Sequence, residues 1–100
     1  MIAVKQDIIR TRLEDVSGDE VFWCGDGKVI KNLRELASAL EEMTEEIYLR
    51  HADGEKNDFS NWVNDVVGDA TLAYQLKKAK TRVTAARRVR DRLEWLKARA

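Results

Sequence analysis

An unbroken helical stripe near the middle of the chain constrains the fold more than any other sequence feature. Its apolar residues recur at the spacing i, i+3, i+4, i+7, i+8, which places them on one face of an α-helix. They are Phe59, Trp62, Val63, Val66 and Val67. Asn57 or Asp58 caps the start of this helix, and Gly68 ends it. Because Phe59 and Trp62 lie on the stripe, we expect both rings in the core rather than stacked on bases.

Four other segments combine a capping residue with apolar residues at helical spacing. The predicted helices begin after Asn32, Thr44, Asp69 and Thr81, or the last two segments form one unbroken helix. A further stripe, in residues 2–16, consists of Ile2, Ile9, Leu13 and Val16. The chain contains no proline, so none interrupts these helices.

Residues 21–30 show a different pattern. Aromatic and β-branched residues flank a Gly-Asp-Gly turn at 25–27, which is typical of a short β-hairpin. Two strands this short must pack against helices to be stable. The sequence therefore predicts a mainly α fold of five or six short helices with one small β-hairpin near residues 21–30.

A chain of 100 residues is expected to form a single domain, residues 1–100. We expect the core in residues 20–80, with terminal helices 2–16 and 82–100 packing on it or on a partner. No apolar run approaches ~18 residues, and the N-terminus lacks a signal-peptide pattern. These features favour a cytoplasmic protein with no membrane partner.

The net charge of zero hides two oppositely charged parts. Residues 1–76 carry 8 basic and 16 acidic side chains, a balance of −8, whereas residues 77–100 carry 10 and 2, a balance of +8. A basic end on an acidic body fits three kinds of contact: with nucleic acid, with an acidic partner, or with the body itself.

The basic final helix is the segment where we expect an interaction surface. Its apolar seam at steps of 3 and 4 resembles a short coiled coil, with arginines on both flanks. Trp95 lies off this seam, which suggests a second contact surface. The predicted interaction residues are Arg82, Arg87, Arg88, Val89, Arg92, Leu93, Trp95 and Leu96. A solvated helix face that contacts nothing explains the same charges.

These features predict a non-enzymatic protein–protein interaction module that self-associates through its terminal helices. The alternative is a small nucleic-acid- or ribosome-associated protein. It would use the cations Lys77, Lys78, Lys80, Arg82, Arg87, Arg88 and Arg92.

The polar residues around the only histidine have a catalytic and a structural interpretation. A catalytic or metal role would require His51, Asp53, Asn57 and Asp58 to converge in a cleft. The structural interpretation has His51 end one helix, where its charged form suits the dipole, while Asn57 and Asp58 cap the next. We favour the second interpretation, because caps alone explain these residue types.

Accordingly, we predict no catalytic, cofactor or metal site. One cysteine, Cys24, and one histidine cannot supply a usual structural zinc set. The residues to which we assign a structural role are His51, Asn57, Asp58, Phe59, Trp62 and Gly68.

A sequence motif spans the same region. It reads His…Lys-Asn-Asp-Phe…Trp-Val…Gly-Asp and is formed by His51, residues 56–59, residues 62–63 and residues 68–69. Together with the spacing of leucines 33, 36 and 40, it resembles a small prokaryotic family of unknown function, found mostly in archaea and some bacteria. The resemblance covers roughly residues 20–80 and implies a recurrent helical module without catalytic residues.

Overall fold

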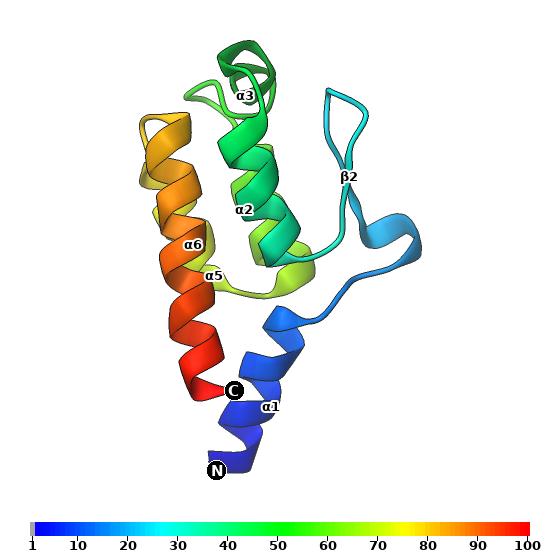
Figure 1. Cartoon of the computed structure of the whole chain (residues 1–100), viewed down its shortest axis with the longest axis vertical. Helices are drawn as coiled ribbons and strands as arrows, with labels where there is room; N and C mark the ends of the chain where they lie inside the picture. The colour runs from blue at the N-terminus through cyan, green and yellow to red at the C-terminus, as the bar shows by residue number, and fades with distance from the viewer. Residues whose placement is uncertain (1) are drawn as a thin grey trace.

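A computed structural model describes the backbone of residues 2–100 and the side chains of residues 5–100 (Figure 1). The described residues form six α-helices and one two-stranded antiparallel hairpin, so the predicted fold class is confirmed. The elements in chain order are α1 (Ile2–Leu13), η1 (Gly18–Glu20), β1 (Phe22–Trp23), β2 (Val29–Ile30), α2 (Leu33–Glu42), α3 (Glu45–His51), α4 (Asp58–Trp62), η2 (Val63–Val67), α5 (Ala70–Lys78) and α6 (Arg82–Arg99).

Five helices begin at the predicted capping residues. In each case a side-chain oxygen accepts a hydrogen bond from the backbone N–H three residues ahead, which satisfies a donor that the helix itself leaves free. The caps are Asn32, Thr44, Asn57, Asp69 and Thr81. The sequence left open whether Asn57 or Asp58 caps α4, and the structure assigns the cap to Asn57. The cap at Thr81 shows that α5 and α6 are separate helices.

The central stripe forms a helix that changes its pitch. After α4, residues 63–67 form a π-helical turn, in which the N–H of Gly68 donates to the carbonyl of Val63 at 2.8 Å. The wider turn leaves Val66 only half-buried, whereas Val63 and Val67 remain in the core. Gly68 ends the element with φ 83°, a left-handed conformation that glycine adopts without a Cβ penalty.

The hairpin presents one buried and one exposed face. Phe22 pairs with Ile30, and both side chains are buried. Trp23 pairs with Val29, and these side chains are 69% and 43% exposed. Successive strand residues point to opposite faces, so the buried Phe22 necessarily leaves Trp23 outside.

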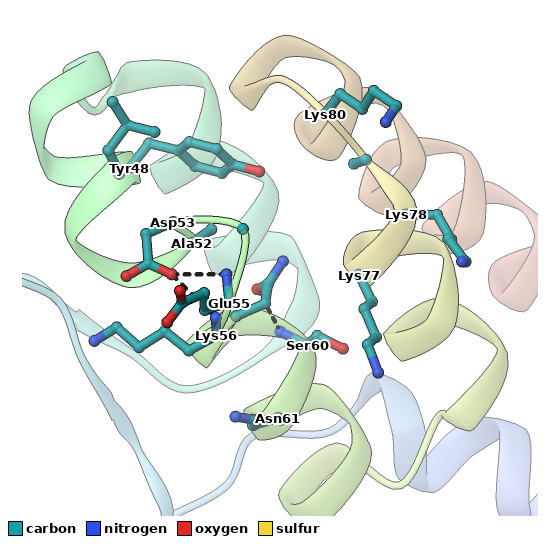
Figure 2. Close-up of a pocket in the computed structure, with 14 residues that line it drawn as sticks. Tyr48, Ala52, Asp53, Glu55, Lys56, Ser60, Asn61, Lys77, Lys78 and Lys80 are labelled. Carbon is teal, nitrogen blue, oxygen red and sulfur yellow. Dashed lines mark hydrogen bonds between the residues drawn. The ribbon is translucent and has the colours of Figure 1, made fainter.

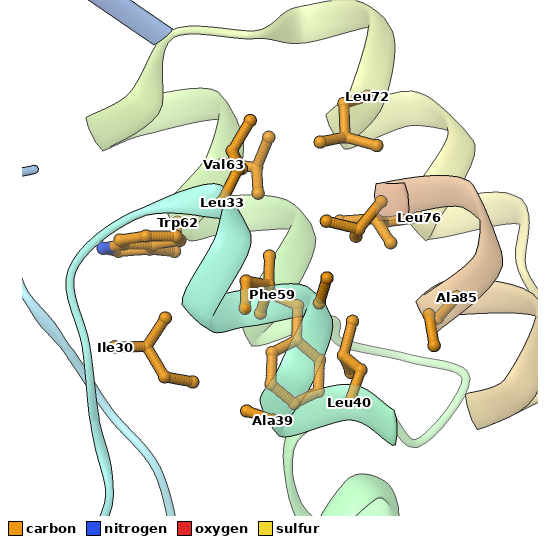
Figure 3. Close-up of a cluster of buried hydrophobic side chains, with 14 of the residues drawn as sticks. Ile30, Leu33, Ala39, Leu40, Phe59, Trp62, Val63, Leu72, Leu76 and Ala85 are labelled. Carbon is orange, nitrogen blue, oxygen red and sulfur yellow. The ribbon is translucent and has the colours of Figure 1, made fainter. Parts of the chain in front are cut away.

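One apolar core joins the hairpin to α2, α4, α5 and α6. Figure 3 shows Leu40 of α2, Phe59 of α4, Leu76 of α5 and Ala85 of α6 in a single cluster. The final helix, which the sequence left to pack on this core or on a partner, lies against α2 of its own chain. The final helix contributes five buried residues, Ala85, Ala86, Val89, Leu93 and Leu96, because it packs lengthwise against α2 (Figure 1).

The N-terminal helix also packs on its own chain. α1 contacts α6 and α2, with Ile9 and Leu13 partly buried against the core. It ends at Leu13 rather than at residue 16, and Val16 instead donates its N–H to the carbonyl of Lys31 at 2.7 Å. The side chain of Ile2, which the sequence placed on this stripe, lies outside the described residues.

A buried carboxylate connects several of these elements. Asp69 is fully buried, and its Oδ1 accepts a hydrogen bond from the N–H of Leu72, which caps α5. Arg92 of α6 donates two hydrogen bonds to the same carboxylate, at 2.7 and 3.0 Å. Arg12 of α1 lies 4.0 Å away. A buried charge is tolerated only when it is paired and hydrogen-bonded, and Asp69 meets both conditions.

Replacing this carboxylate should destabilise the fold strongly. Asp69→Ala would remove a helix cap and leave Arg92 without its counter-ion in a site where the arginine side chain is 11% exposed. We expect the free energy of unfolding to fall by about 3–5 kcal/mol, measured by urea denaturation. The matched control, Asp65→Ala, removes an exposed carboxylate from the neighbouring turn and should cost no more than about 0.5 kcal/mol. Similar losses in both variants would contradict this assignment.

Candidate interaction surface

The apolar seam of the final helix is not accessible in the folded chain. Val89, Leu93 and Leu96 are 0%, 3% and 0% exposed, because they face α2, α1 and α5 of the same molecule. The predicted contact of these three residues with a partner therefore has to be corrected: the seam joins α6 to its own chain. A pattern that suits a coiled coil suits an intramolecular helix pair equally well.

Several arginines of α6 are also bound to the chain's own body. Arg82 donates to the carbonyls of Leu40 and Glu41, at 2.7 and 3.1 Å, and so satisfies free acceptors at the end of α2. Arg88 donates to the carbonyl of Gln75 at 2.6 Å. Arg82, Arg88 and Arg92, the last through Asp69, therefore attach α6 to the rest of the chain.

A surface ion pair adds to this contact. Arg90 donates two hydrogen bonds to the carboxylate of Glu41, each 2.8 Å long. These bonds hold the pKa of Glu41 below its ordinary value. Among the predicted interaction arginines, Arg87 is the one whose side chain is exposed and forms no hydrogen bond or ion pair with residues 5–100.

Trp95 remains at the surface as the sequence suggested. Its side chain is 41% exposed. The guanidinium carbons of Arg92 and Arg99 lie over its ring, 4.4 and 4.0 Å from the centroid. Arg99 also donates to the carbonyl of Trp95 at 3.1 Å. We call these three residues the Trp95 cluster. Cation–π contacts hold the ring in one orientation while part of it stays in contact with solvent.

His51 joins the hairpin to α4. Its Nε2 accepts a hydrogen bond from the N–H of Gly25 at 2.9 Å, so this nitrogen carries no proton. Its Nδ1 lies 2.9 Å from Oδ2 of Asp58 and therefore acts as the donor. The ring also packs against Phe22 and Phe59, with centroids 5.1 and 5.2 Å away. The ring therefore connects the hairpin to α4, a contact that the position of His51 at a helix end did not indicate.

The other members of the polar motif lie apart from His51 or serve the backbone. The carboxylate of Asp53 accepts hydrogen bonds from the N–H groups of Lys56 and Glu55, which lower its pKa. Asn57 caps α4 and donates to the carbonyl of Leu76 at 3.2 Å. The motif therefore positions helices and a turn, and the four polar residues do not converge in one cleft.

The aromatic residues of the motif are packed as predicted. Phe59 is buried and stacks on Phe22 and Tyr48, with centroids 5.1 and 5.7 Å apart. Trp62 is buried, and its indole N–H donates to the carbonyl of Glu20 at 2.7 Å. Cys24 is buried as well, and burial raises the pKa of its thiol.

Within residues 2–100, no group of three or more His, Cys, Asp or Glu side chains is arranged to hold a metal ion. Over the same residues, no helix is both long and apolar enough to cross a membrane.

A groove of about 690 Å³, which the sequence did not predict, lies between the loop after α3 and the end of α5 (Figure 2). Lys77, Lys78 and Lys80 lie on one side of it, and residues 53–56 lie on the other. Tyr48 lies at the groove with its hydroxyl directed toward the lysine side (Figure 2). Burial raises the pKa of this phenol. The run of lysines was the only indication of this groove in the sequence, because the opposite wall comes from a separate segment.

The role assigned to His51 can be tested by keeping its ring and removing its nitrogens. His51→Phe should preserve the aromatic packing but leave the Gly25 N–H without its acceptor. We expect a loss of about 1–2 kcal/mol in the free energy of unfolding and faster hydrogen exchange at the Gly25 amide, read by NMR. Arg50→Ala, an exposed neighbour, serves as the control. Unchanged exchange at Gly25 in His51→Phe would refute the proposed contact.

Comparison of the chain with protein-family models, with curated proteins and with solved structures found no match. The resemblance to a small prokaryotic family of unknown function stays a prediction.

Proposed function

We propose that the protein is a non-enzymatic protein-interaction module that self-associates through its terminal regions: the outer face of α6 in one copy contacts, in the other copy, the segment 14–20 that follows α1. The observation that carries this proposal is the Trp95 cluster. The inner side of α6 is already used by the core, so a partner of this helix must contact its outer side.

The chemistry of the cluster suits a protein contact. Tryptophan and arginine are the residue types that most often dominate the binding energy of an interface. Arg92 is fixed by Asp69 and Arg99 by the backbone of Trp95, so little side-chain freedom remains to be lost on binding. The ring offers apolar area, and Arg99 offers a charge beside it.

A second copy of the chain carries a complementary surface. The segment 14–20 holds four acidic side chains, Glu14, Asp15, Asp19 and Glu20, all exposed. None of them forms an ion pair with a side chain of residues 5–100. Because each copy has both surfaces, reciprocal contacts between the Trp95 cluster and this segment would close a two-fold dimer. Opposite charges at the rim would set the orientation of the two copies.

The chemistry around the histidine and the cysteine supports the non-enzymatic part of the proposal. Both ring nitrogens of His51 are engaged in hydrogen bonds within the chain. The thiol of Cys24 is buried, and its raised pKa disfavours the nucleophilic thiolate. Neither side chain has the environment of an activated nucleophile or base.

Self-association can be tested with a pair of tryptophan variants. We expect the wild-type chain to sediment as a dimer at tens of micromolar and moderate salt. Trp95→Ala should weaken the dimer by roughly 30-fold or more, as for a residue at the centre of an interface. The matched control is Trp23→Ala, which removes a more exposed tryptophan, 69% against 41%, from the hairpin.

Two outcomes would overturn the proposal. A wild-type chain that is strictly monomeric by analytical ultracentrifugation under these conditions would exclude self-association. Equal weakening by Trp23→Ala and Trp95→Ala would show that the Trp95 cluster is not the contact.

A further inference from the structure

Three lysines without an ion pair to residues 5–100 lie close together on one face of the molecule, beside the end of α5. In the part of the chain described with side chains, Lys77, Lys78 and Lys80 form no ion pair, unlike Arg82, Arg90 and Arg92 of α6. All three lie along the groove beside the end of α5 (Figure 2). Exposed lysines along a concave site favour an anionic ligand.

An exposed aromatic ring continues this face along α5. Tyr74 is 62% exposed and precedes Lys77 and Lys78 by three and four residues, so the three share one side of the helix. The Lys78 Nζ lies 5.5 Å from the centroid of the Tyr74 ring. A second hollow, of about 350 Å³, is lined by Tyr74, Gln75, Lys78, Arg88 and Asp91. Lys78 borders both this hollow and the groove, so the two form one continuous surface.

We propose that this surface binds single-stranded nucleic acid, with the phosphates along Lys77, Lys78 and Lys80 and a base stacked on Tyr74. Exposed aromatic rings beside a positively charged groove are the features that hold single strands without sequence preference. A duplex fits less well, because its bases are stacked inside and cannot reach the ring. The Tyr48 hydroxyl, which points toward the lysine side of the groove, supplies a hydrogen-bond donor for a phosphate or sugar oxygen (Figure 2).

The acidic side chains of the surface limit where the backbone of the strand can lie. Asp53 and Glu55 lie on the wall opposite the lysines, and Asp91 borders the hollow. The carboxylate of Asp53 is turned to two backbone N–H groups of its own loop. Repulsion from this wall would keep the phosphates on the α5 side of the groove, next to Tyr74.

The site goes beyond the proposed self-association, because it uses neither Trp95 nor the segment 14–20. It also differs from the cation set that the sequence suggested. Arg82, Arg88 and Arg92 are bound to the body of the chain, which leaves the lysines of α5 and of the following turn to contact phosphate.

The lysines are tested by binding of labelled oligouridylate and oligodeoxythymidylate, about 12 nucleotides long, followed by fluorescence anisotropy between about 50 and 200 mM salt. The double variant Lys77→Gln, Lys78→Gln should bind more weakly. It should also reduce the slope of log K against log salt by roughly 1.4, because each phosphate contact to a single strand contributes about 0.7. The matched control, Lys31→Gln with Lys97→Gln, removes the same charge from exposed positions elsewhere and should bind as the wild type does.

Stacking is tested separately at Tyr74. Tyr74→Ala should weaken binding by roughly 5- to 100-fold, the effect of losing one stacked base. Tyr74→Phe keeps the ring and should bind as the wild type does, whereas Trp23→Ala, an aromatic loss on the hairpin, should have no effect. Tyr74 and both lysines are exposed, so circular dichroism should show each variant folded.

Four outcomes would overturn the inference. They are no binding of either oligonucleotide by the wild type at the lowest salt, equal loss in the two double-lysine variants, no effect of Tyr74→Ala, and tighter binding of polyglutamate or of phosphatidylglycerol vesicles. The last outcome would assign the surface to an acidic protein or to a membrane.

Discussion

The pairing of Asp69 with Arg92 is the contact on which the arrangement of the helices depends. The carboxylate caps α5 from its own backbone position and accepts two hydrogen bonds from α6, while Arg12 of α1 lies nearby. Apolar packing between α2 and α6 supplies most of the stabilisation but little direction, since apolar contacts tolerate sliding. A fully buried charge has a single satisfied position. The pair therefore fixes the register of α6 against the rest of the core.

The opposite charges of the two parts of the chain partly pair with each other within the molecule. Much of the basic excess of α6 is matched within the molecule: Arg82 by the end of α2, Arg90 by Glu41 and Arg92 by Asp69. Charge counted along a sequence cannot distinguish cations that bind the body from cations that remain free. The lysines of α5 and of the turn after it have no ion pair with residues 5–100 and lie together along a groove, so the surface suited to an anionic partner lies beside α6.

Local signals in the sequence were sufficient for the elements and for most of their ends, although α1 ends three residues earlier than predicted. The five caps and the stop at Gly68 are decided within three or four residues of chain, and those residues identify them. Contacts between distant segments were not predictable in this way. The seam of α6 fits a partner helix or α2 equally well, and nothing near His51 indicates that its Nε2 meets Gly25. The groove at Tyr48 could not be predicted for the same reason, because its two walls come from segments that are distant in the sequence.

Ionic strength distinguishes the two kinds of charged contact in this molecule. The Debye length is about 10 Å at 0.1 M salt, so exposed lysines lose much of their attraction for a phosphate there. Asp69 is fully buried and Arg92 nearly so, and pairs of this kind are screened far less. Salt that releases an anionic partner from α5 therefore leaves the register of α6 intact. Loss of binding with salt, without loss of helical signal, would locate the salt-sensitive charges on the surface rather than in the fold.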